Sequence, residues 1–136
     1  MKLGIVVANY NAGITGKMRE AAEEKAEEEN IEVEEILEVP GAYDTPLAAD
    51  KLARKSSIDA VVALGAIITG DTDHDEVIGH AAAEKLSQVS LDRGTPVMLG
   101  ITGPGMSSRE AKERIDYAAQ AVESAKKMHE NLSEVE

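Results

Sequence analysis

The residues best suited to chemistry lie at 70–76, where Gly-Asp-Thr-Asp-His-Asp-Glu directly follows an apolar stretch at 60–68. This β-branched run predicts a strand buried on both faces, and the polar residues after it predict the first turn of a helix. Amides of a helix N-terminus favour an anion, and Thr72 could cap this helix. The same partial positive charge disfavours an imidazolium, so we expect a neutral His74 that can accept a proton.

Polar, glycine or aromatic residues also lie where the other predicted strands end. Strand 3–8 ends at Asn9-Tyr10-Asn11, strand 31–39 at Gly41-Ala42-Tyr43-Asp44, and the last strand within 99–105. Ligands of open α/β sheets bind at the carboxyl ends of the strands, so we expect one site there. Its ring, carboxylate, amides and imidazole would suit a planar, polyol-bearing heterocycle with a phosphate ester.

Stretches with apolar residues at helical spacing separate the strands and must position these ends. They predict helices at about 14–30, 47–53, 72–91 and 111–132, strands at 3–8, 31–39, 60–68 and 97–101, and a turn at 103–105. This alternation predicts a flavodoxin-like fold, a three-layer α/β/α sandwich with a four-stranded parallel sheet. We expect one domain over residues 1–136, with the acidic strand 31–39 near an edge.

Composition narrows the function classes. The 136 residues include no cysteine, which excludes disulfides, thiol nucleophiles and zinc–thiolate sites, and no apolar run reaches the roughly 18 residues of a membrane span. The chain starts on a strand pattern without a signal peptide, so we expect a cytoplasmic protein. The net charge of −12 argues against nucleic acid or an anionic membrane as partner.

Four segments resemble the lumazine synthase family, in order along nearly the whole chain. Val-Pro-Gly-Ala-Tyr-Asp-Thr-Pro-Leu-Ala at 39–48 is similar to a family motif, and 63–74 resembles the family's strand and catalytic loop. Asn9-Tyr10-Asn11 matches its aromatic-Asn pair, and Gly103-Pro104-Gly105-Met106 followed by Glu113-Arg114 resembles the archaeal branch.

The resemblance implies a reaction without metal or organic cofactor. Family members condense 5-amino-6-ribitylaminouracil with 3,4-dihydroxy-2-butanone 4-phosphate and release phosphate and water. The product, 6,7-dimethyl-8-ribityllumazine, is the penultimate intermediate of riboflavin biosynthesis. Imine formation, phosphate elimination and ring closure need mainly proximity and one general acid/base.

The resemblance also implies how the aminouracil is held. Tyr10 would stack on the pyrimidine, Asn11 would contact it, and backbone groups of Ile67 and Ile68 would bind its edge. The ribityl chain would be held by the backbone amide of Ala42 and by the carboxylate of Asp44.

The remaining implied roles concern the phosphate, the proton transfers and the assembly. The amides of Asp71 and Thr72 would hold the phosphate, with Arg114 as counter-charge and Arg109 as the rival, and His74 would be the general acid/base. Leu99 would reach the site of a neighbouring subunit, so the active site would lie at a subunit interface. Family members form pentamers, which can close into sixty-subunit shells.

Several alternatives stay open. The chain could be an archaeal-type riboflavin synthase or a non-catalytic shell protein that binds lumazine or flavin. Acidic residues within 71–76 could hold a hard metal ion, but such residues are ordinary at a helix start, so we expect no metal. We expect His80 and His129 to be structural or solvated and Tyr43 to serve packing. Self-repulsion of the acidic subunit predicts that salt increases assembly or stability.

Overall fold

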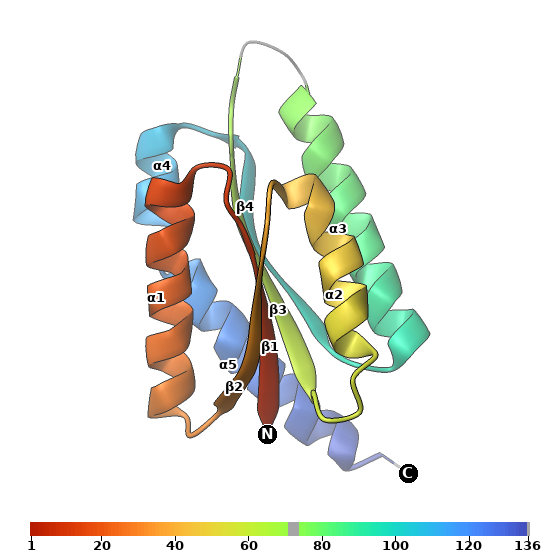
Figure 1. The fold of residues 1–136 in the computed structure, drawn as a ribbon. Helices are drawn as coiled ribbons and strands as arrows, with labels where there is room; N and C mark the ends of the chain where they lie inside the picture. The colour runs from red at the N-terminus through yellow and green to blue at the C-terminus, as the bar shows by residue number, and fades with distance from the viewer. Residues whose placement is uncertain (71–73, 136) are drawn as a thin grey trace.

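The computed structural model describes residues 1–70 and 74–135. Strands and helices alternate along the chain, and the strands form the centre of the molecule (Figure 1). In chain order the elements are β1 (Lys2–Ala8), α1 (Ala12–Glu28), β2 (Glu32–Val39), the short 3₁₀ helix η1 (Ala42–Asp44), α2 (Thr45–Ala53), β3 (Ala60–Ile68), α3 (His74–Arg93), β4 (Val97–Met106), α4 (Ser108–Glu113) and α5 (Tyr117–Ser133).

The four strands form one parallel sheet in the order β2-β1-β3-β4. This confirms the predicted four-stranded parallel sheet, and its order matches the first four strands of the flavodoxin-like order 2-1-3-4-5. The apolar strands β1 and β3 are central in the sheet. The acidic strand β2 lies at an edge, where part of the strand can meet water.

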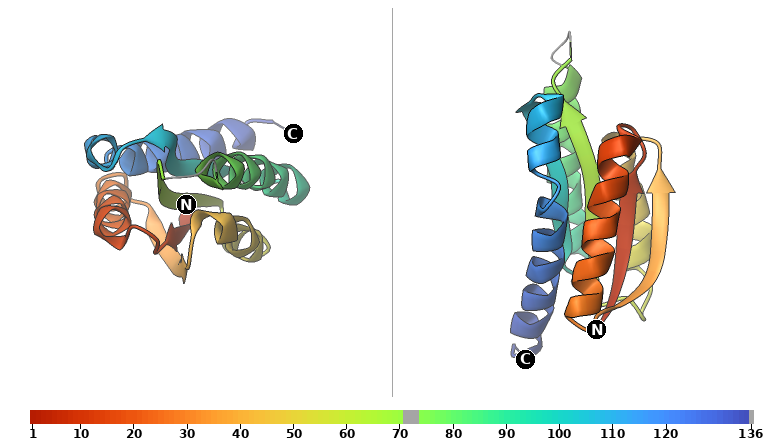
Figure 2. Two further views of the ribbon diagram at one scale, coloured as in Figure 1. Left: turned by 90° about the horizontal axis from the view of Figure 1, so that it is seen from above. Right: turned by 90° about the vertical axis from the view of Figure 1, so that its left-hand side faces the viewer.

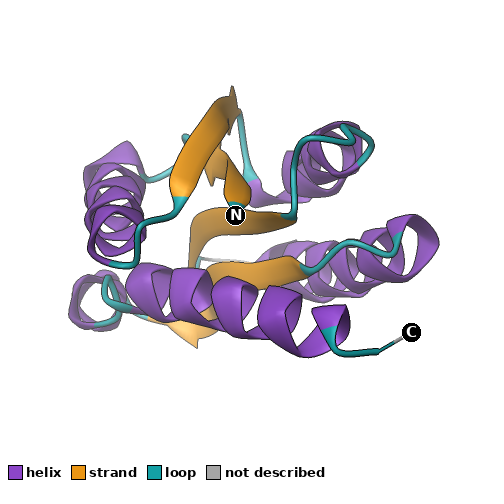
Figure 3. Cartoon of the chain, turned by 90° about the horizontal axis from the view of Figure 1, so that it is seen from below, coloured by secondary structure: helices purple, strands orange, loops and turns teal. Residues whose placement is uncertain are grey.

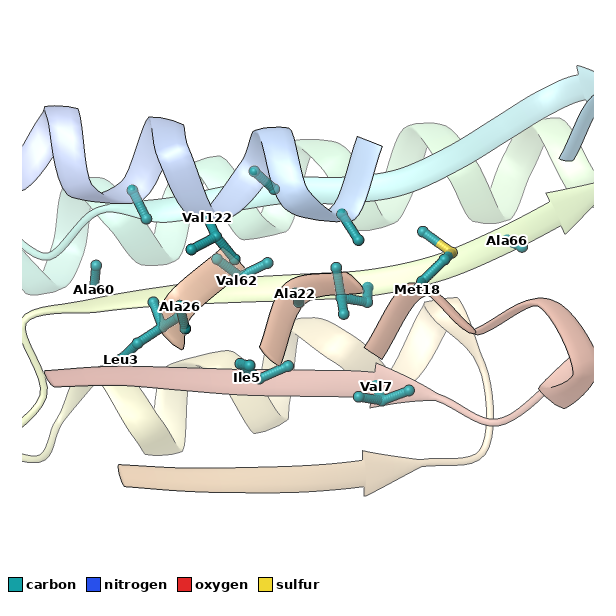
Figure 4. Close-up of a cluster of buried hydrophobic side chains, with 14 of the residues drawn as sticks. Leu3, Ile5, Val7, Met18, Ala22, Ala26, Ala60, Val62, Ala66 and Val122 are labelled. Atoms are coloured by element: carbon teal, nitrogen blue, oxygen red, sulfur yellow. The ribbon is translucent and has the colours of Figure 1, made fainter. Parts of the chain in front are cut away.

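Helices cover both faces of the sheet (Figure 2). On one face α1 and α5 pack against side chains such as Ile5 and Val62, and Ala22 of α1 belongs to the same cluster (Figure 4). On the other face α2 and α3 pack against Val6 and Ala63. Because the chain has no Phe or Trp, aliphatic side chains fill the space between the helices and the sheet. Alanines along the helices let the helices approach the sheet closely.

Both termini lie at the end of the molecule away from the carboxyl ends of the strands (Figures 1 and 3). The loops after β1 and β2 and the start of α3 lie at the opposite end. Within residues 1–70 and 74–135, no helix combines the length and apolar character that crossing a bilayer requires.

The predicted turn at 103–105 is wrong, because β4 continues through it to Met106. The pairing with β3 shifts register between Ala66 and Ile68, and Ile68 then pairs with Met106. Gly103 and Gly105 have φ angles of 89° and 81°, which side-chain-bearing residues rarely adopt. The glycines therefore mark an irregular stretch of strand, a pattern that resembles a turn in the sequence.

The predicted last helix is two helices, α4 and α5. Between them the amides of Tyr117 and Ala118 donate to the carbonyls of Arg114 and Ile115, three residues back. These tighter turns interrupt the α-helix but keep its apolar face toward the sheet. Apolar spacing alone therefore could not reveal the break, which places Arg114 at the C-terminal end of α4.

Candidate active site

A cavity of about 330 Å³ lies at the carboxyl ends of β1, β2 and β3, beside the start of α3. It brings together the predicted site residues Tyr10, Asn11, Ala42, Ile67, Ile68 and His74. Its other described walls come from Ala8, Gly41, Tyr43, Ala66, Gly70, Asp75 and Ile78. The cavity therefore has a mostly apolar lining with a few polar groups, as small-molecule sites commonly have.

The loop after β1 is fixed from two sides. The Tyr10 amide donates to the carbonyl of Pro40 at 2.9 Å, and Tyr10 itself is exposed beside the cavity. Asn11 has a left-handed backbone, φ 67°, and its Nδ2 donates to the carbonyl of Ala66 at 2.8 Å. Asparagine tolerates this conformation better than most residues. The bond from Nδ2 to Ala66 fixes the side-chain amide, and its carbonyl oxygen Oδ1 can accept a hydrogen bond from a ligand.

The turn after β2 presents the backbone of Ala42 to the cavity. Ala42 is buried, and its carbonyl accepts a hydrogen bond of 2.7 Å from the hydroxyl of the buried Thr45. The carboxylate of Asp44 accepts from the amide of Gly41 at 3.0 Å and closes the same turn. Asp44 thus lies beside the site but does not line the cavity, and its carboxylate binds the backbone of its own turn.

His74 and Asp75 begin α3, and both line the cavity. The predicted phosphate-binding amides of Asp71 and Thr72, and the predicted Thr72 cap, lie outside the described residues. In the described part of the chain, no three His, Cys, Asp or Glu residues are grouped to hold a metal ion. His80 on α3 and His129 on α5 do not contribute to the cavity lining.

The two candidate arginines lie in different environments. The side chain of Arg114 is 36% exposed, and its Nη1 and Nη2 lie 3.7 Å from Met106 Sδ and 3.5 Å from a Glu110 carboxylate oxygen, respectively. The side chain of Arg109 is 90% exposed and lies 3.5 Å from Glu113. Because Met106 pairs with Ile68, Arg114 is anchored next to the end of β3, whereas Arg109 extends into solvent.

The carboxylate beside Arg114 stays ionised at neutral pH. Hydrogen bonds from the Ser107 amide and hydroxyl hold the pKa of the Glu110 carboxyl below its usual value, and Arg114 lowers it further. Ser107 and Glu110 bond reciprocally as a capping box, which fixes the first turn of α4. The helix that carries Arg114 therefore has a defined start and direction.

Leu99 lies away from the cavity of its own chain. It is on the edge strand β4, pairs with Ala63, and is 54% exposed. An exposed leucine on an edge strand is available to a neighbouring molecule.

Sequence reasoning gave no binding role to seven cavity-lining residues, although most of them lie in the segments it singled out: Ala8, Gly41, Tyr43, Ala66, Gly70, Asp75 and Ile78. Ile78 follows His74 by four residues on α3, and this spacing puts both side chains on one helix face, so it could have been found. Tyr43 was expected to serve packing and not to contact a ligand, but it is exposed and lines the cavity. The neighbouring Pro-Gly turn was the signal, because it separates Tyr43 from the strand pattern that suggests burial.

Comparisons with known proteins show which proteins this chain is similar to. The family described as 6,7-dimethyl-8-ribityllumazine synthase matches residues 1–133. Proteins of that name from Halorubrum lacusprofundi and Halobacterium salinarum are 57% and 53% identical to this chain, over 92% and 96% of it and 93% and 98% of their own lengths. The protein of that name from Archaeoglobus fulgidus is 48% identical, over 98% of this chain and 94% of its own length.

Proposed function

Because the chain belongs to the 6,7-dimethyl-8-ribityllumazine synthase family, we propose that the cavity at the carboxyl ends of β1, β2 and β3 is its active site. The chain is a transferase of riboflavin biosynthesis that forms 6,7-dimethyl-8-ribityllumazine. The observation that carries the proposal is the shared cavity of Tyr10, Asn11, Ala42, Ile67, Ile68 and His74.

The proposed binding site for 5-amino-6-ribitylaminouracil uses one ring and several backbone groups. The exposed ring of Tyr10 offers a face for stacking, and Asn11 Oδ1 can accept from a ring N–H. Backbone groups of Ile67 and Ile68 would bind the pyrimidine edge, because both residues line the cavity where β3 ends. The Ala42 amide would hold the ribityl chain, and Asp44 would support it by closing the turn or by reaching the outer hydroxyls.

The proposed phosphate site of the butanone substrate lies between the start of α3 and the end of α4. Asp71 and Thr72 would supply amides there, and Arg114 would supply the positive charge. The anchoring of Arg114 beside β3 favours it over the solvent-exposed Arg109. Glu110 pairs with Arg114 without a bidentate contact, so the guanidinium retains N–H groups for phosphate.

His74 is the proposed general acid/base. The 5-amino group would attack the ketone of the butanone phosphate, and the carbinolamine would lose water to give an imine. Phosphate would then leave together with the proton on C3, and the resulting enol would tautomerise to a ketone at C3. The ribitylamino nitrogen would attack this ketone and close the second ring with loss of a second water. Each step moves a proton, and a positioned imidazole typically accelerates such transfers by about 10²–10⁴-fold. Holding both substrates in one cavity supplies the proximity.

The proposed assembly is a homo-oligomer, a pentamer or a multiple of pentamers, with the active site at a subunit interface. The exposed Leu99 on the edge strand supports this, because it would complete the wall of a neighbouring subunit's cavity. The proposed compartment is the cytoplasm, because both substrates are small, water-soluble and polar.

The test is the rate of lumazine formation from the two substrates, followed by absorbance or fluorescence. We expect the wild-type rate to exceed the spontaneous rate, and His74→Ala to lower kcat by about 10²-fold or more. His80→Ala is the matched control on the same helix and should retain wild-type kcat. Equal rates for His74→Ala and wild type would refute the role of His74. Protein that only dismutates lumazine would be a riboflavin synthase, and protein that binds lumazine without turnover would be a binder.

A further inference from the structure

The end of β4, residues 103–106, contacts several parts of the proposed site without lining the cavity itself. Gly103 passes directly over the backbone of β3. A Cβ atom at position 103 would overlap the carbonyl oxygen of Ile67, and its φ of 89° also disfavours any side chain. Glycine therefore permits a close approach that fixes the backbone of Ile67, which lines the cavity.

The next residue, Pro104, packs against the helix that carries His74. A Cβ atom added to Gly79 of α3 would lie 2.6 Å from Pro104 Cδ and 3.1 Å from Cγ. The proline ring is bonded to the backbone at two points, so it cannot rotate away as a flexible side chain can. Gly79 follows His74 by five residues, so this contact lies about one and a half turns from the imidazole.

Met106 connects the end of β3 with Arg114. Its carbonyl accepts a 2.8 Å hydrogen bond from the Thr69 amide, where β3 ends. Its buried sulfur lies 3.7 Å from Arg114 Nη1, on the helix that follows. The same short segment thus touches the proposed pyrimidine edge, the histidine helix and the proposed phosphate-binding arginine.

We propose that residues 103–106 form a positioning segment that sets the distances among the backbone of Ile67, His74 and Arg114. Gly79 and Met106 are the positioning residues, because they transmit the segment's placement to α3 and to Arg114. The inference rests on the proposed site assignment. A β4 that ended at Ile101, as its apolar pattern indicates, would leave the start of α3 and the end of α4 without this common support.

The first test is Gly79→Ala, with Gly16→Ala of α1 as the matched control. A Cβ at Gly16 meets open space, so that variant should retain full activity and gain helix stability. Gly79→Ala must displace α3 or Pro104, and because a displacement of about 1 Å costs about 10²-fold, we expect kcat to fall at least tenfold. Active sites are titrated with the lumazine product, so that kcat refers to folded molecules.

The second test is Met106→Leu, with Met98→Leu on the same strand as control. Leucine nearly conserves the buried volume but removes the sulfur acceptor of Arg114. We expect KM for the butanone phosphate to rise about threefold, as for a lost weak hydrogen bond, with KM for the aminouracil unchanged. Met98→Leu should change neither constant.

The outcomes separate this inference from the site assignment. An active wild type whose Gly79→Ala variant keeps its kcat, or loses only thermal stability, would overturn the positioning role. An equal rise in both KM values for Met106→Leu would overturn the proposed link to Arg114. If wild-type protein forms no lumazine above background, the site assignment fails and the inference fails with it.

Discussion

The two arginines near α4 show how side-chain environment separates candidates that the sequence leaves equal. Arg109 and Arg114 lie near the start of the predicted last helix, and each has a glutamate four residues away. Only Arg114 is held by a buried side chain, Met106, at the end of the sheet. Held in this way, Arg114 loses less side-chain entropy on binding phosphate than the solvent-exposed Arg109 would.

We therefore expect Arg114→Ala to weaken the binding of the phosphate substrate and not that of the aminouracil. Loss of a charge-assisted hydrogen bond costs about 1.5–3 kcal/mol, so KM for the butanone phosphate should rise by roughly 10–100-fold. Arg109→Ala, the matched control, should leave it unchanged. Steady-state kinetics with each substrate varied in turn gives both values, and the reverse result would assign the phosphate site to Arg109.

Asp75 is a second residue whose role follows from its place. It is the carboxylate that lines the cavity among the described residues, and the adjacent Glu76 is exposed outside the lining. A carboxylate accepts hydrogen bonds from amines and hydroxyls and repels phosphate, so it should favour the aminouracil. We expect Asp75→Asn to raise KM for the aminouracil about tenfold and Glu76→Gln to leave it unchanged. An equal rise in this KM for both variants would indicate that negative charge at the start of α3, and not the position of Asp75, affects aminouracil binding.

The sequence indicates which residues gather at the site, because they directly follow predicted strands. It does not indicate which hydrogen bonds these residues form with their neighbours. Tyr10, Asn11 and His74 could be assigned because strand ends converge in a parallel sheet. The bond from Asp44 to Gly41 depends on the conformation of one turn, which residue types alone leave open.

At the scale of elements, the capping box at the start of α4 stabilises the helix that carries Arg114. Ser107 accepts from the Glu110 amide at 3.2 Å, and Glu110 accepts from the Ser107 amide at 3.1 Å. The Ser-x-x-Glu spacing is readable from the sequence, whereas the end of α4 at Glu113 is not, because the apolar pattern continues.

This capping box predicts a pH dependence of stability. The pKa of Glu110 is lowered from its ordinary 4.5, so its contribution is fully present above pH 4.5 and is lost as the pH falls through the lowered value. Glu110→Gln should therefore lower the thermal midpoint at pH 7, and its difference from wild type should shrink below pH 4. Calorimetry from pH 7 to pH 3 checks this, with Glu113→Gln as control. A constant difference across that range would contradict the predicted role of ionised Glu110.

The molecule as a whole combines an aliphatic core with a strongly acidic surface. Ion pairs join the two helices of one face: Lys25 of α1 pairs with Glu123 of α5 at 2.8 Å, and Lys126 of α5 pairs with Glu29 of α1 at 2.9 Å. Glu123 and then Glu28 hold the pKa of Lys25 above its usual value. Asp and Glu outnumber Lys and Arg by 26 to 14, which leaves a net charge of −12, so copies of the chain repel one another.

Salt should therefore favour assembly. The screening length falls from about 10 Å at 0.1 M to about 3 Å at 1 M, which weakens repulsion between acidic subunits more than contacts at short range. We expect the sedimentation profile to shift toward larger oligomers, pentamers or their multiples, as salt rises. A profile that stays unchanged from low to molar salt would contradict this.

The alternation of strands and helices made the sheet and its layers predictable, whereas the path of β4 was not. Apolar strand patterns identify which segments pair but not how far a strand continues through glycine and proline. The Gly103-Pro104-Gly105 stretch remains in the sheet because it packs against β3 and α3, and these contacts are long-range in sequence.

The most direct test of the site is a crystal structure of the protein with 6,7-dimethyl-8-ribityllumazine bound. We predict that the ring lies against Tyr10 with its pyrimidine edge at the backbone of Ile67 and Ile68. The ribityl chain should extend toward Ala42, and His74 should lie beside the newly formed ring. Product bound elsewhere on the chain, with this cavity empty, would contradict the account.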